Sequence, residues 1–170
     1  MRPLAIASRE IRLEAIARLV TGDVGLIVAL IRGAEPGSAI AAFLLVNVVM
    51  GVIWAWRGQG RLRAHAPVAP RADEEAELEG PEATKRRVIK GNVPSFLAVV
   101  VLALVYPAAG AVIAGVPAGI GAGDLHLLSW LRRLEREREE CFLREAPQSA
   151  FSGARRPVYT LPTSEVTAAT

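Results

Sequence analysis

Two long blocks of this chain, residues 19–56 and 91–130, contain almost no charged side chains, although Asp, Glu, Lys and Arg make up 22% of the sequence. A helix that crosses a bilayer needs about 20 consecutive apolar residues. A helix on the surface of a soluble protein keeps a polar face, which these blocks lack. The blocks therefore predict an all-α integral membrane protein rather than a soluble helical bundle.

Each block is too long for one crossing. A straight helix over residues 19–56 would measure about 57 Å, against roughly 30 Å for the hydrocarbon core. Gly33 and Pro36 in the first block, and Tyr106 and Pro107 in the second, suit the end of one helix and the start of the next. We therefore expect four short transmembrane helices arranged as two hairpins, over residues 19–56 and 93–125.

The basic residues predict the orientation, because Lys and Arg stay in cytoplasmic loops. With two hairpins, the basic residues of segments 1–18, 57–92 and 126–146 lie on one side, and Arg32 lies on the other. An excess of arginine over lysine together with abundant alanine is typical of a high-GC bacterial genome. We expect a multi-pass protein of the cytoplasmic (inner) membrane of a bacterium, with both termini in the cytoplasm.

The segments outside the hairpins are charged. Residues 1–18 are expected to form an interfacial N-terminal helix or, as an alternative, a cytoplasmic extension of the first transmembrane helix. Residues 57–92, acidic in the middle and basic at both ends, predict a disordered cytoplasmic linker. An alternative role for the acidic run is to bind a partner.

The C-terminal part predicts a helix followed by a tail. Asp124 can cap a charged cytoplasmic helix over residues 126–146, in which Glu140 and Arg144 would pair. Residues 147–170 are polar and interrupted by proline, so we expect a disordered tail.

Small residues recur at every fourth position of the last apolar stretch: Ala111, Gly115, Gly119 and Gly123. Such residues form one smooth face of a helix, which lets a second helix approach closely. The prediction is a helix-packing face that contacts the first or third transmembrane helix. Homo-oligomerisation and a glycine-lined pore are the alternatives.

Asp23 and Asp124 are the acidic residues of the predicted transmembrane helices, both near their cytoplasmic ends. Two acids at matching depth could form an ion or proton site. The alternative is that Asp23 reaches interfacial water or pairs with Arg18, and that Asp124 only caps the following helix.

The sequence carries no motif for catalysis, a metal or a cofactor. A phosphate-binding loop, a nucleophile elbow and an HExxH helix are all lacking. The topology accounts for the basic segments, which also lack interleaved aromatic residues, so nucleic-acid binding is not expected. We predict that the chain is not an enzyme and that its partners are the lipid bilayer and either a second copy or another membrane protein.

The predicted function is therefore a small scaffold or accessory subunit that acts through helix packing and its charged cytoplasmic helix. The alternative is a small transporter or a pore-forming, holin-like protein that uses Asp23. Four short helices with an acid in the first resemble the general architecture of small multidrug-resistance transporters. The long linker and the C-terminal helix depart from that pattern.

Overall fold

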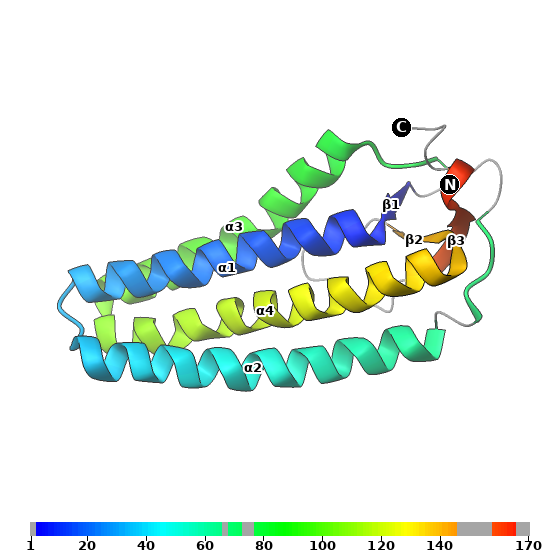
Figure 1. Ribbon diagram of the computed structural model, residues 1–170. Helices are drawn as coiled ribbons and strands as arrows, with labels where there is room; N and C mark the ends of the chain where they lie inside the picture. The colour runs from blue at the N-terminus through cyan, green and yellow to red at the C-terminus, as the bar shows by residue number, and fades with distance from the viewer. Residues whose placement is uncertain (1–2, 66–67, 73–76, 146–157, 166–170) are drawn as a thin grey trace.

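Four long helices lie side by side, and a small sheet sits at one end of the bundle (Figure 1). The computed structural model describes residues 3–65, 68–72, 77–145 and 158–165. In chain order the elements are β1 (Leu4–Ile6), α1 (Ala7–Ile31), α2 (Pro36–His65), α3 (Pro81–Val105), α4 (Pro107–Arg138), β2 (Glu140–Glu145) and β3 (Val158–Pro162). We call the end with the strands the sheet end and the opposite end, where α1 meets α2 and α3 meets α4, the turn end.

The two tight turns fall where the sequence placed them. After α1, Gly33 adopts a φ of 96°, and the Ala34 amide donates to the Ala29 carbonyl at 3.0 Å. The Glu35 carboxylate then accepts the backbone N–H groups of Gly37 and Ser38 at the start of α2. Between α3 and α4 a single residue, Tyr106, is non-helical. The described residues therefore form helical hairpins at both predicted positions.

Three described helices are long and apolar enough to cross a membrane: Pro36–Arg57 of α2, α3 and α4. Helix α1 does not meet the same criterion, because Glu14, Arg18 and Asp23 all lie in its last 18 residues. The structure is thus mostly helical, with three helices that could span a bilayer.

The helices extend further than the sequence predicted. Residues 8–18 continue directly into α1, so they extend that helix and do not form a separate one. Helix α2 runs on to His65 and α3 already begins at Pro81, so much of the expected linker is helical. Residues 66–67 and 73–76, which include most of the acidic run, lie outside the described residues.

The predicted C-terminal helix was also wrong in part. Helix α4 runs without interruption through Asp124 to Arg138, so Asp124 does not cap a second helix. Glu140 and Arg144 belong to a strand instead of a helical pair. Glu139, with a φ of 54°, ends the helix, and the chain then enters β2. Residues 158–162, expected in a disordered tail, form β3, so the fold is not all-α.

The strands form an antiparallel sheet in the order β1-β2-β3. The side chains of Phe142 and Leu143, neighbours in β2, point to opposite faces and are both fully buried. Phe142 packs with Ile11, Leu128 and Leu131 of α1 and α4, whereas Leu143 packs with Leu4, Ala72 and Leu161. The sheet thereby acquires an apolar core on each face.

Residues of the α2–α3 connection cover both edges of this sheet. At β1, the Leu4 amide donates to the Glu77 carbonyl and the Glu79 amide donates to the Leu4 carbonyl, both at 2.8 Å. At β3, the Ala72 amide donates to Thr160 and the Thr160 amide donates to Pro70. An exposed strand edge is a template for further pairing. These hydrogen bonds pair both edges of the sheet, and they also order the α2–α3 connection.

Helix α4 lies at the centre of the bundle because its small residues let three helices approach it. Added Cβ atoms on Gly115, Gly119 and Gly123 would lie within 3.1 Å of atoms in α2. The partner of this glycine face is therefore α2, and not the first or third helix as expected. Other faces of α4 meet α1, where Gly22 and Gly25 lie against Ala118 and Ala114, and α3, where Gly110 and Ala111 pack near Ala103.

Replacing Gly119 with alanine should separate α2 from α4. The new Cβ would lie 2.4 Å from the Asn47 carbonyl oxygen, and backbone cannot move aside cheaply. We expect a loss of about 1–3 kcal/mol in the free energy of unfolding, measured by denaturant titration in detergent micelles. Gly91 of α3 is the control, because an added Cβ there meets nothing within 4 Å. Gly91→Ala should be neutral or slightly stabilising, and an equal loss in both variants would contradict the packing.

Candidate functional site

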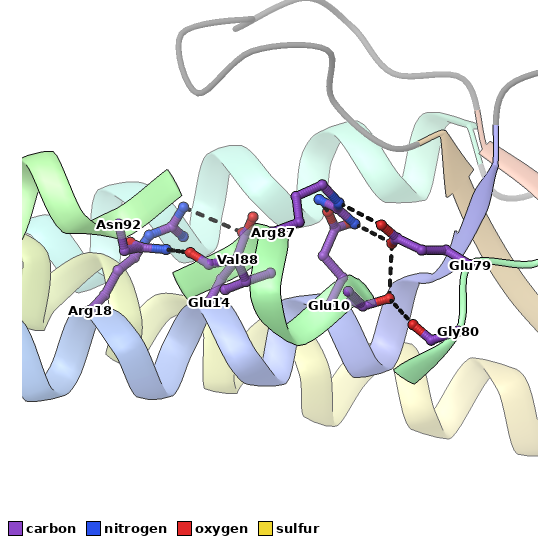
Figure 2. A network of polar contacts seen from close by, with 9 residues as sticks. Glu10, Glu14, Arg18, Glu79, Gly80, Arg87, Val88 and Asn92 are labelled. Atoms are coloured by element: carbon purple, nitrogen blue, oxygen red, sulfur yellow. Dashed lines mark hydrogen bonds and ion pairs between the residues drawn. The ribbon is translucent and has the colours of Figure 1, made fainter. Parts of the chain in front are cut away.

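Two groups of buried charges join the helices, one at the sheet end and one about halfway along the bundle. We call one group the Arg87 cluster: Glu10 of α1, Glu79 of the α2–α3 connection, and Thr84 and Arg87 of α3. Figure 2 shows the Arg87 guanidinium between the two carboxylates. Its Nη1 donates to Glu10 Oε1 at 2.7 Å, while Nε and Nη2 donate to the two oxygens of Glu79 at 3.0 and 2.7 Å.

The bidentate contact with Glu79 uses the planar geometry of the guanidinium, which lysine could not reproduce. The Glu10 side chain is 0% exposed, so its carboxylate depends on Arg87 and on its other protein contacts for compensation. Removing one partner of such a buried pair typically costs about 3–5 kcal/mol. The cluster therefore fixes the position of α3 against α1.

The start of α3 explains how Glu79 reaches Arg87. Gly80 and Pro81 set the first turn of the helix. The Thr84 hydroxyl lies 2.8 Å from Glu79 Oε2 and 3.2 Å from the Gly80 carbonyl oxygen. The hydrogen bonds from Arg87 hold the pKa of Glu79 below its ordinary value of 4.5. Glu79 is therefore ionised at neutral pH and forms a charged link between the connection and α3.

A second group, the Asp124 cluster, joins three helices: Glu14 and Arg18 of α1, Trp54 of α2 and Asp124 of α4. Asp124, only 3% exposed, accepts hydrogen bonds from the Arg18 guanidinium and from Trp54 Nε1, the latter at 2.7 Å. Arg18 also lies 5.9 Å from the centre of the Trp54 ring and pairs with Glu14 at 3.3 Å. Asp124 is thus a junction of α1, α2 and α4.

The structure does not bring Asp23 and Asp124 together. Arg18 pairs with Asp124, whereas Asp23 lies five residues, or about 7.5 Å, further along α1. Asp23 is exposed on the outside of the bundle. Among the residues that the structure describes, it has no hydrogen-bond or ion-pair partner. The pairing with Arg18 that the sequence suggested for Asp23 belongs to Asp124.

Along the axis of α1, Asp23 lies further from the helix end than its sequence position suggested. It stands between Gly22 and Gly25, which face Ala118 and Ala114 in the middle of the apolar part of α4. Along α1 it is nine residues, or about 13.5 Å, from Arg32 at the turn end. Were a hydrocarbon core of roughly 30 Å to begin at Arg32 and to enclose α1, Asp23 would lie near its midplane, where an aspartate costs about 2.5–3.5 kcal/mol.

The sheet end also carries a groove of about 950 Å³ between α4 and the strands. Burial raises the pKa of the Cys141 thiol in this groove, so a reactive thiolate is disfavoured there. Within the described part of the chain, no group of three or more His, Cys, Asp or Glu residues is placed to hold a metal ion. The groove is lined by Ser129, Arg132, Glu135, Arg136, Glu139, Cys141, Pro162, Thr163 and Ser164.

Sequence reasoning missed the Arg87 cluster because it assigned Glu79 and Arg87 to a disordered linker. The Gly80-Pro81 pair was the available signal, since it is typical of a helix start. No pattern in the sequence indicated that Glu10 would be buried. Comparisons with protein-family models, with curated proteins and with solved structures find no match for this chain.

The Arg87 cluster predicts a pH-dependent stability. Because the folded pKa of Glu79 lies below 4.5, its charge stabilises the fold above that pH, and this contribution is lost as the pH falls through the folded pKa. We expect Glu79→Gln to lose about 1–3 kcal/mol at pH 7 and much less at pH 3, as measured by thermal unfolding in detergent across that range.

The matched control is Glu82→Gln, because the Glu82 side chain is 88% exposed and lies 3.9 Å from Lys85. This exposed pair should contribute little at any pH. Identical pH profiles for the two variants would show that Glu79 does not hold α3 in place.

Proposed function

We propose that this chain is a non-catalytic integral membrane protein, a small scaffold or accessory subunit that crosses the membrane four times as two hairpins. The observation that carries the proposal is the division of the bundle into a small-residue interior and an apolar exterior. Interior positions of α4 such as Gly115 and Ala118 are buried, whereas large apolar residues of α2 and α3 are exposed. They include Leu45, Val48, Val52, Leu97 and Val101, each more than half exposed.

Contacts between α1 and α4 support a fourth crossing. Gly22 and Gly25 of α1 lie against the middle of α4, and Gly121 of α4 lies against Ala15 and Leu19 of α1. A bilayer around α4 would therefore also surround α1. Of the three charges that exclude α1 from the candidate spans by composition, Glu14 and Arg18 are paired, because Arg18 contacts both Glu14 and Asp124.

The distribution of basic residues supports a cytoplasmic sheet end and the inner membrane of a bacterium. Exposed Arg12, Arg57, Lys85, Arg86 and Arg132 lie at or near the sheet end, and Arg32 lies at the turn end. Positive residues are retained on the cytoplasmic side. In this orientation the N-terminus and β3, the last described strand, both face the cytoplasm.

The interior gives less support to the transporter or holin-like alternative. The α2–α4 and α1–α4 seams are closed by backbone contacts at Gly119 and Gly22, where even a methyl group would clash. Asp23, the residue that such a function would use, lies on the outer surface and not between helices. A solute path lined by Asp23 would therefore need a second molecule.

The sheet end supports an assembly role. The last turns of α4 expose both signs of charge, including Arg132, Arg133, Arg136 and Glu137, at the groove between α4 and the strands. The packing of Phe142 against Ile11, Leu128 and Leu131 holds the sheet directly against α1 and α4. A partner bound there would be held at a fixed distance from the membrane surface.

A pair of serine-to-cysteine variants tests the orientation. In a Cys141→Ser background, Ser38→Cys places a thiol at the turn end and Ser164→Cys places one at the sheet end, both at exposed positions. We expect a membrane-impermeant maleimide to label the Ser38→Cys protein in spheroplasts. The Ser164→Cys protein should be labelled only after the membrane is opened. The reverse pattern would contradict a cytoplasmic sheet end.

Reconstitution into liposomes distinguishes the scaffold function from the transporter function. We expect liposomes that contain the purified protein to show no K⁺ or H⁺ flux above that of empty liposomes. Purification in mild detergent should recover the protein with another membrane protein in a fixed ratio. Flux that Asp23→Asn abolishes, or recovery of the isolated monomer alone, would overturn the proposed function.

A further inference from the structure

The outer face of α1 carries a single stripe of exposed residues that no described element covers. Ile16, Val20, Ile27 and Ile31 are 45%, 50%, 54% and 78% exposed, and Asp23 is exposed at the centre of the stripe. The spacing of three and four residues places all five on one side of the helix. We call this set the Asp23 stripe. The opposite side of α1 packs against α4, through Gly22 and Gly25.

Apolar residues at alternating intervals of three and four form the seam of paired helices. Lipid would cover the four aliphatic side chains without penalty, but it would not solvate the Asp23 carboxylate. A short aspartate side chain near the midplane cannot reach the headgroups as lysine or arginine can. Arg18, the nearest cation along α1, is already engaged by Glu14 and Asp124.

We propose that the Asp23 stripe binds a transmembrane helix of another membrane protein, and that this helix presents an arginine or lysine to Asp23 near the midplane. Opposite charges at membrane depth pair with one another, and such polar contacts join helices where lipid gives no hydrophobic driving force. The proposal deepens the proposed scaffold function, because it names the surface and the chemistry of the partner.

A second copy of this chain fits the stripe less well. The apolar segments of its helices, residues 19–31, 38–56, 93–105 and 107–131, contain no lysine or arginine. Two copies joined by the Asp23 stripe would place two acids opposite each other. Charge complementarity therefore favours a different protein as the occupant.

The test uses the full-length protein in phosphatidylcholine vesicles and labelled synthetic helices made of leucine and alanine. Three helices carry arginine, leucine or glutamate at the central position, and energy transfer reports binding. We expect the arginine helix to bind about tenfold more tightly than the leucine helix. Asp23→Asn should reduce this preference to about twofold or less, and Asp23→Lys should transfer the preference to the glutamate helix.

The control moves the acid to another face at a similar depth. Val48 of α2 is 61% exposed, and its neighbour Asn47 lies against Gly119 of α4. In the double variant Asp23→Asn/Val48→Asp the acid lies on α2, whose exposed face presents Leu45 and Val52 in place of the four isoleucine and valine side chains of the Asp23 stripe, and we expect this variant not to recover the tenfold preference. Recovery there would overturn the assigned surface.

Equal binding of the arginine and leucine helices by the parent protein would also overturn the proposal. So would dimerisation of the parent protein that Asp23→Asn abolishes, since a second copy would then cover the stripe. These results leave the flux measurement unchanged, and ion flux without a partner would reject the scaffold function independently of helix binding.

Discussion

The close approach of α4 to its neighbours is the constraint on which the rest of the structure depends. Glycines 115, 119 and 123 let the backbone of α2 lie directly against α4, and Gly22 and Gly25 do the same for α1. Helices in lipid gain no hydrophobic energy from association, so van der Waals contact between closely spaced backbones must hold them together. Once α4 is enclosed in this way, the large aliphatic side chains of α2 and α3 must face outwards, and the bundle acquires a surface suited to a bilayer.

Charge pairs add to the small-residue packing at two levels of the bundle. The Asp124 cluster joins α1, α2 and α4 about halfway along these helices. The Arg87 cluster, shown in Figure 2, joins α3 to α1 at the sheet end. Buried ion pairs add little net stability, but breaking one leaves an uncompensated charge. Their effect is therefore to select one register among the sliding arrangements that a face of small residues would tolerate. Asp23 contrasts with both clusters. Its carboxylate has no hydrogen-bond or ion-pair partner in the described part of its own chain.

The connection between α2 and α3 shows how a polar segment becomes ordered. Its own residues offer little apolar surface, and alone they could not offset the entropy lost on ordering. The strands supply what is lacking: β1 and β3 each present an unpaired edge, and residues 70–72 and 77–79 satisfy these edges with backbone hydrogen bonds. Glu79 is thereby brought to Arg87. The same segment thus closes the sheet and helps to fix the start of α3.

The sequence by itself determined the two apolar blocks, the turns at Gly33 and Tyr106, and the small-residue face of α4, because these depend on local composition and helical spacing. Only the tertiary structure decided that α2 is the partner of that face, that Asp124 is a buried junction, and that Asp23 lies on the outer surface of the bundle. Each of these outcomes depends on which helix packs against which, and hydropathy does not encode that choice. The sheet escaped prediction for the same reason: β2 and β3 are short and separated in sequence, so their pairing becomes favourable only when α1 and α4 bring Ile11 and Leu131 against Phe142.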